Sequence, residues 1–129
     1  MLNLNWYSAL NHPPLTPPSW VFSPAWAGLY TMIFISFVLF ALKRTEHSKI
    51  SGFVLFFVQL LLNFIWPSIF FYFKNISMAF WVLISLDFAV LLTLIEFYKI
   101  SKKSAYFLIP YFIWILFATY LNFGFLVLN

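Results

Sequence analysis

The residues best suited to chemistry in this chain are tryptophans and a few amides set among apolar residues. One set has intervals of 4, 3 and 4 and therefore shares one face of a helix: Gln59, Asn63, Trp66 and Phe70. Two more sets run at intervals of four: Pro110, Trp114, Ala118 and Asn122, and Trp26, Tyr30 and Phe34. If these three sets converge, they would form an apolar small-molecule pocket with a few polar anchors. The same pattern is also typical of the polar contacts and small residues that hold membrane helices together, so both interpretations stay open.

The composition places these residues in a membrane. The chain has 129 residues, of which 64% are apolar and 8% charged, against roughly 45–50% and 25% in soluble domains. A helix needs roughly 20 residues to cross a bilayer. Four apolar stretches reach or approach this length: 25–42, 50–73, 76–98 and 104–128. Alternation typical of barrel strands is absent. We expect an all-α membrane protein, a single domain in which an up-down bundle of four transmembrane helices follows a proline-tryptophan segment at 1–24.

The basic residues predict how the bundle lies in the membrane. Six of the seven fall in the connections at 43–49 and 99–103, and only Lys74 lies elsewhere. The positive-inside rule puts those two connections in the cytosol. The net charge of +4 is thus explained by the bilayer, and no nucleic acid is expected as a partner. Short connections also predict that each helix packs beside the next.

Prolines predict helix boundaries and kinks. Ser23 is expected to cap the first span, with Pro24 as its first helical residue. Pro67 and Pro110 interrupt two later spans, and each removes a helical hydrogen bond. Because lipid offers no replacement partner, we expect both kinks to face protein or a cavity.

Ionisable groups are few. Asp87 lies near the middle of the third span, where we expect a structural hydrogen bond inside the bundle; a proton relay is the alternative. Glu96 is spaced to pair with Lys99. His12 and His47 are expected on opposite sides of the membrane and cysteine is absent, so no metal site is predicted.

Four ordered motifs resemble those of the TspO/translocator-protein family, also called tryptophan-rich sensory proteins: WYSALNHPPLTPPSW, PAWAGLY, QLLLNFIWPSIFF and LIPYFIWILFATYLN. The resemblance implies a multi-pass membrane receptor that binds porphyrins, such as protoporphyrin IX or haem, and other bulky apolar molecules. It also implies light-dependent porphyrin degradation with Trp26 and Trp114 as the catalytic residues, no required cofactor, and a location in a bacterial cytoplasmic membrane or alternatively a mitochondrial outer membrane. A small-molecule transporter or a structural membrane-partner protein is the alternative function.

The resemblance assigns residues to the pocket and to its cover. The expected ligand-binding residues are Phe22, Trp26, Gln59, Asn63, Trp66, Trp114, Ala118 and Asn122. The proline-tryptophan segment corresponds to a lid, with Trp6, Tyr7, Pro18 and Trp20 as its main residues. Family members usually have a further spanning helix before this segment, whereas only 1–5 precede Trp6 here. We therefore expect a homodimer or larger oligomer to supply the missing pocket wall and to cover amides that would otherwise face lipid.

Overall fold

The protein is an all-α bundle. The computed structural model describes Leu10, residues 22–46 and residues 48–128, with only the backbone of Phe22 and Ser23. Its helices are α2 (Phe22–Leu42), α3 (Ile50–Pro67), the π-helix η2 (Ser68–Tyr72), α4 (Ile76–Ile100) and α5 (Lys102–Leu128). Within these described residues, four helices are long and apolar enough to cross a membrane. The predicted all-α membrane fold is confirmed.

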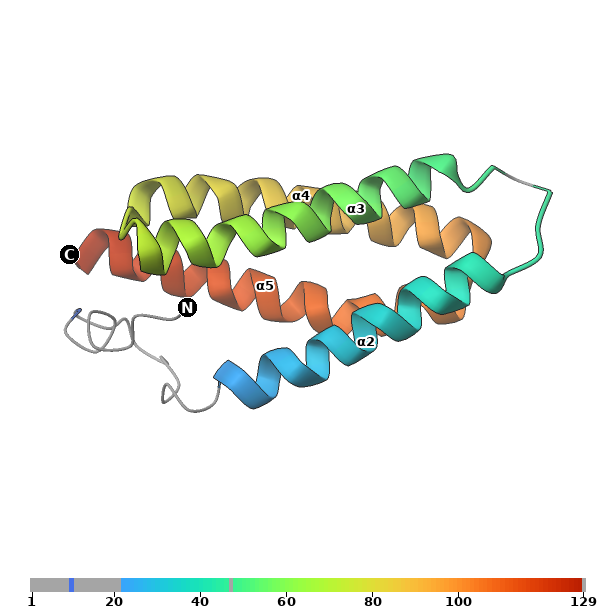
Figure 1. Ribbon diagram of the computed structural model, residues 1–129, viewed down its shortest axis with the longest axis horizontal. Coiled ribbons are helices and arrows are strands. Elements are labelled where there is room, and N and C mark those ends of the chain that lie inside the picture. The colour runs from blue at the N-terminus through green and yellow to red at the C-terminus, as the bar shows by residue number, and fades with distance from the viewer. Residues whose placement is uncertain (1–9, 11–21, 47, 129) are drawn as a thin grey trace.

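The helices alternate in direction along an elongated bundle, and the start of α2 and the end of α5 lie at the same end (Figure 1). α2 packs along α5, α5 along α4, and α4 along α3. α2 and α3 are thus the two ends of an arc, and they meet mainly through their side chains. The prediction that each helix packs beside the next holds less well for this pair, because the seven residues of the 43–49 connection reach far enough to join helices whose backbones do not lie close together.

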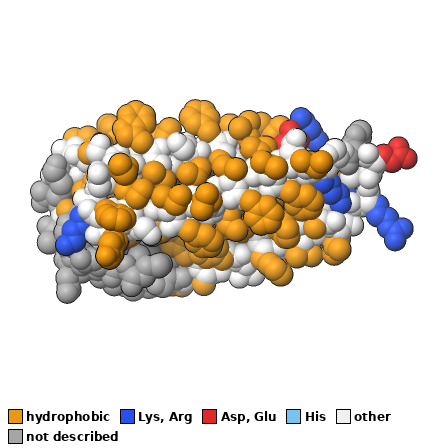
Figure 2. Space-filling model, turned by 45° about the horizontal axis from the view of Figure 1, so that its top comes forward, with side chains coloured by type: hydrophobic (Ala, Val, Ile, Leu, Met, Phe, Trp, Pro, Cys, Tyr) orange, Lys and Arg blue, Asp and Glu red, His pale blue; other side chains and the backbone are white. Residues whose placement is uncertain are grey.

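The surface of the bundle fits a lipid environment. Apolar side chains cover the face that Figure 2 shows, and most of the Lys, Arg and acidic side chains visible there lie toward one end. This basic end carries the 43–49 connection and the turn between α4 and α5; Lys74 lies at the opposite end. At the basic end Glu96 pairs with Lys99 at 3.2 Å, as the spacing predicts.

Close packing fixes the basic half of α2. The Ser36 hydroxyl donates to the Ser104 carbonyl at 2.7 Å, and the Ser104 hydroxyl donates back to the Ser36 carbonyl at 2.6 Å. Both side chains are fully buried, so α2 and α5 are in close contact there. The fully buried Phe40 ring stacks on Phe97 with 4.0 Å between ring centroids and lies against Gly52 at the start of α3.

The starts of two helices differ from the predictions made from the sequence. α2 begins at Phe22, so Ser23 lies inside the helix and is not its cap. Proline is tolerated throughout the first turn, since the N–H groups there have no helical partner, and Pro24 therefore does not mark the start. At the other connection α5 begins at Lys102, and the Ser101 hydroxyl accepts a hydrogen bond from the Ser104 N–H.

Pro67 is followed by a wider turn. The sequence predicts a kink there, and the chain forms the π-helix η2, in which the Phe73 N–H donates to the Ser68 carbonyl at 3.0 Å. This turn places the consecutive residues Phe70 and Phe71 both in the interior. π-Bulges are frequent at functional sites, and this one ends the helix that carries most of the predicted polar anchors.

Candidate functional site

A chain of hydrogen bonds joins three helices in the core. The Tyr30 hydroxyl of α2 donates to the Asn63 carbonyl oxygen of α3. The Asn63 amide donates to the Tyr111 hydroxyl of α5 at 2.8 Å, and that hydroxyl donates to Gln59 Oε1 at 2.8 Å. Asn63 and Gln59 are only 3% and 1% exposed. Among the described residues, the Gln59 Nε2 group has no hydrogen-bond partner.

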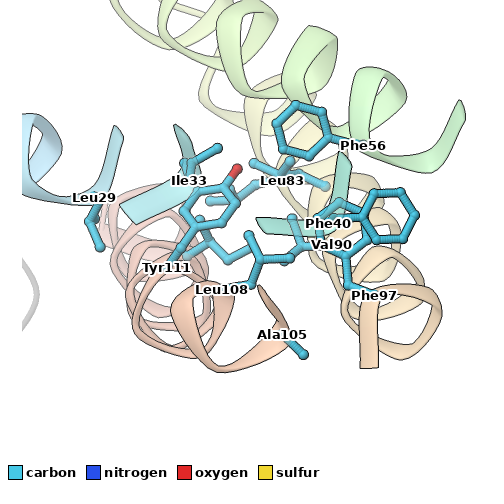
Figure 3. Packing of buried hydrophobic residues seen from close by; sticks show 12 residues of the cluster. Leu29, Ile33, Phe40, Phe56, Leu83, Val90, Phe97, Ala105, Leu108 and Tyr111 are labelled. Atoms are coloured by element: carbon cyan, nitrogen blue, oxygen red, sulfur yellow. The ribbon is translucent and has the colours of Figure 1, made fainter. Parts of the chain in front are cut away.

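Aromatic rings lie directly beside this chain. The Trp26 ring centroid is 5.6 Å from that of Tyr30, 6.5 Å from that of Tyr111 and 6.4 Å from that of Trp114. Trp26 and Trp114 meet edge to face at 87°, a favourable arrangement for aromatic pairs. In Figure 3 the Tyr111 ring lies among the buried apolar side chains, with its hydroxyl oxygen in red. α2 and α5 therefore form an aromatic wall backed by polar groups.

A second polar group lies further along the same helices. The Trp66 indole N–H donates to Asn122 Oδ1 at 2.9 Å, and the Asn122 amide donates to the Ile76 carbonyl at 3.1 Å. Asn122 thereby ties α3, α5 and the start of α4 together. Ala118 lies one helical turn from both Trp114 and Asn122 and packs against the apolar core. It is the small residue between the aromatic wall and this second group.

The structure thus brings most of the predicted pocket residues to one interior region. Those in or next to the two groups are Trp26, Gln59, Asn63, Trp66, Trp114, Ala118 and Asn122. The hydrogen bonds of Asn63, Trp66 and Asn122 all go to other side chains or to backbone of the same bundle. Covering the amides therefore does not require a second subunit, contrary to the argument from the sequence.

Two members of the predicted stripes do not face the interior. Phe34 is 67% exposed and Pro110 is also exposed, so its ring does not face protein or a cavity as expected. A spacing of four residues overshoots the helical turn of 3.6, so three such steps rotate a stripe by about 120°. The inward line of α5 runs through Tyr111 and Ile115 instead.

Tyr111 is the functional residue that sequence reasoning missed. It is fully buried and contacts Trp26 and two polar partners, although its position beside Pro110 drew attention to the proline alone. The available signal was the spacing of Leu108, Tyr111 and Ile115, which follows the 3.6-residue period and carries one polar tip.

Asp87 makes a hydrogen bond inside the bundle, as expected. Thr119 Oγ1 lies 2.6 Å from Asp87 Oδ2 and 2.8 Å from the Ile115 carbonyl, which links α4 to α5. Within the part of the chain that the structure describes, no group of three metal-binding side chains comes together.

The predicted cover of the pocket lies outside the described residues. This holds for Trp6, Tyr7, Pro18 and Trp20, for both histidines, and for the side chain of Phe22. The one described residue before α2 is Leu10, which packs on a cluster at the opposite end from the basic connections. That cluster consists of Phe70, Phe71, Ala79, Leu121 and Phe125.

Comparison with known proteins gives a consistent result over almost the whole chain. The model of the TspO/MBR family matches residues 2–128. The chain is 40% identical to "Tryptophan-rich protein TspO" of Archaeoglobus fulgidus, with 96% of this chain and 80% of that protein covered. It is 34% identical to the human "Translocator protein", covering 93% of this chain and 72% of the human one. It is also 34% identical to "Tryptophan-rich sensory protein" of Cereibacter sphaeroides, covering 96% and 77%.

Proposed function

Because this chain belongs to the TspO/MBR family, we propose that it is a membrane receptor for porphyrins, such as protoporphyrin IX and haem, and for other bulky apolar molecules. The binding site is the region between the aromatic wall of α2 and α5 and the polar side chains of α3. The bilayer is its solvent and the source of its apolar ligands. Of the two membranes that the resemblance implies, we favour a bacterial cytoplasmic membrane.

The observation that carries this proposal is the edge-to-face contact of Trp26 and Trp114 beside buried amides. A flat aromatic macrocycle gains area and quadrupole contacts from indole rings. Few polar anchors are needed to orient it. The Gln59 Nε2 donor supports this role, since a buried donor without a partner is costly until an acceptor arrives.

We propose further that light drives degradation of the bound porphyrin. A bound porphyrin is then the substrate: it absorbs the light, dioxygen is the oxidant, and Trp26 and Trp114 quench or trap the excited products. No further cofactor is required. The rings of these two tryptophans lie within contact distance of each other, so one bound macrocycle can touch both.

Tryptophan-fluorescence quenching tests the binding site. Protoporphyrin IX is titrated in the dark into purified protein, and we expect saturable quenching at micromolar or lower concentration. Trp66→Ala should weaken binding by removing the Asn122 contact and an apolar surface, and Ala118→Phe by filling space beside Trp114. Trp81→Ala is the matched control, because that indole is 64% exposed on α4. Unchanged affinity in both site variants would remove this assignment.

A structural membrane protein is the second candidate, favoured by the mutual satisfaction of the polar groups. Asn63 and Asn122 each bridge two other helices, as side chains that hold membrane helices together do. Under this alternative, the titration gives no saturable quenching, while substitution of either amide still lowers stability.

A homodimer stays a prediction. The four described helices bury their amides within one copy, so a dimer would form through apolar, small-residue contacts between lipid-facing surfaces. Mass measurement in mild detergent tests it: a strictly monomeric protein that binds porphyrin tightly would show that one copy suffices.

A further inference from the structure

The two ends of the helical arc, α2 and α3, contact each other along a line that we call the seam. Different side-chain contacts hold its two halves together. Near the basic end, Phe37 and Phe40 of α2 interlock with the rings of α3. Phe37 makes ring contacts with Phe53, Phe56 and Phe57, and Phe40 with Phe53. This half also has the Ser36–Ser104 hydrogen bonds, which hold α2 to α5. It is a fixed part of the core.

Toward the opposite end, Tyr30 makes the hydrogen bond and the ring contact that cross the seam between the described side chains. Its ring stacks on Phe64 with 6.1 Å between centroids, and its hydroxyl donates to Asn63. Nearer the start of α2, Trp26 makes its ring contacts with Tyr111 and Trp114 of α5. Among the described side chains of α2 and α3, no hydrogen bond or ring contact crosses the seam beyond Tyr30.

Tyr30 lies between the surface of the bundle and the buried polar residues of the site. Phe64, its stacking partner, is 56% exposed and therefore faces lipid. Asn63, Tyr111 and Gln59 lie behind it and are buried. The bonds of Asn63 to Tyr111 and of Tyr111 to Gln59 do not involve Tyr30, so that network survives when the Tyr30 ring moves.

We propose that Tyr30 is the gate of a lateral passage between α2 and α3, through which a flat apolar ligand moves from the lipid to the Trp26–Trp114 wall. The inference rests on the proposed porphyrin-binding function. The gate opens by rotation of one side chain, which breaks the hydrogen bond to Asn63 and the stacking contact with Phe64 and changes the ring contact with Trp26. The fixed half of the seam stays closed, so the passage opens only toward the end at which α2 begins.

A gate sets both the association and the dissociation rate, because the ligand passes it on entering and on leaving. Binding of protoporphyrin IX is followed by stopped-flow tryptophan quenching in the dark, with protein in lipid nanodiscs. Tyr30→Phe keeps the ring and removes the hydrogen bond, so we expect association and dissociation both to accelerate about fivefold. Tyr30→Ala removes the stack as well and should accelerate both about tenfold or more.

Tyr106→Phe is the matched control, since it removes a hydroxyl from an exposed tyrosine of α5 whose ring contacts Tyr98 of α4. Its rates should equal those of the unaltered protein. Unchanged rates in both Tyr30 variants would overturn the gate, because the ligand would then enter elsewhere. A weaker affinity with an unchanged association rate would also overturn it and make Tyr30 a binding residue.

A second readout needs no porphyrin, so failure of the gate and failure of the proposed function can be told apart. Lipids with brominated acyl chains quench tryptophans that they reach. We expect Tyr30→Ala to increase this quenching, and the increase to disappear when Trp26→Phe is added. Equal quenching with and without Tyr30→Ala would overturn the gate even if porphyrin binding is confirmed. Increased quenching without porphyrin binding would support the passage and reject the ligand.

Discussion

Gly52→Ala offers a direct test of how α3 packs against α2. A Cβ atom at position 52 would lie 2.4 Å from Phe40 Cζ and 3.0 Å from Phe40 Cε1. The Phe40 ring has little room to retreat, because it is fully buried and stacks on Phe97 at 4.0 Å. Overpacking of this kind costs about 1–3 kcal/mol. Alanine regains up to about 1 kcal/mol of helix propensity over glycine.

The net expectation is a loss of about 1–2 kcal/mol in the free energy of unfolding for Gly52→Ala. Gly28→Ala is the control in the same chain: it lies in α2, is exposed, and a Cβ there would meet nothing within 4 Å. That variant should be neutral or more stable by up to about 1 kcal/mol. Reversible unfolding of reconstituted protein in dodecyl sulfate measures both. Equal stability of the two variants would refute the close contact of α2 and α3 at Phe40.

Two further predictions concern helix contact and orientation. Ser36→Ala removes the hydrogen bond that the Ser36 hydroxyl donates to the Ser104 carbonyl and the 3.2 Å contact between the two hydroxyls, so the free energy of unfolding should fall by about 1 kcal/mol in the same assay; an unaltered value would mean that this contact does not hold α2 to α5. For orientation, an impermeant thiol reagent applied to intact cells should label Asn75→Cys and spare Ser48→Cys, since the positive-inside rule predicts a cytosolic basic end; the reverse pattern would invert the protein in the membrane.

The sequence was a good guide to the helices because length and apolarity alone decide which segments can span a bilayer. The predicted span at 50–73 is α3 with η2, and the span at 76–98 is α4 less its last two residues. The π-turn was not predictable in this way. A proline removes one N–H, but whether the chain kinks or widens its turn depends on the packing of Phe70 and Phe71 in the core.

The candidate site was predicted in part for a similar reason. Gln59 and Asn63 are buried as their spacing indicates, because a polar side chain facing lipid is expensive. Tyr111 was missed because an apolar ring is compatible with any position in a membrane span. Only the hydrogen bonds of its hydroxyl to Asn63 and Gln59 mark it as part of the site. The packing of α2 along α5 also lay beyond the sequence, since a stripe of residues fixes the face of a helix and not its neighbour.

The structure of the protein with protoporphyrin IX bound, determined from crystals grown in the dark, tests the central claim most directly. The account predicts the macrocycle in contact with the indoles of both Trp26 and Trp114, beside Ala118, with α3 on its other side. A porphyrin bound only on the lipid-facing surface of the bundle, away from these two tryptophans, would contradict it.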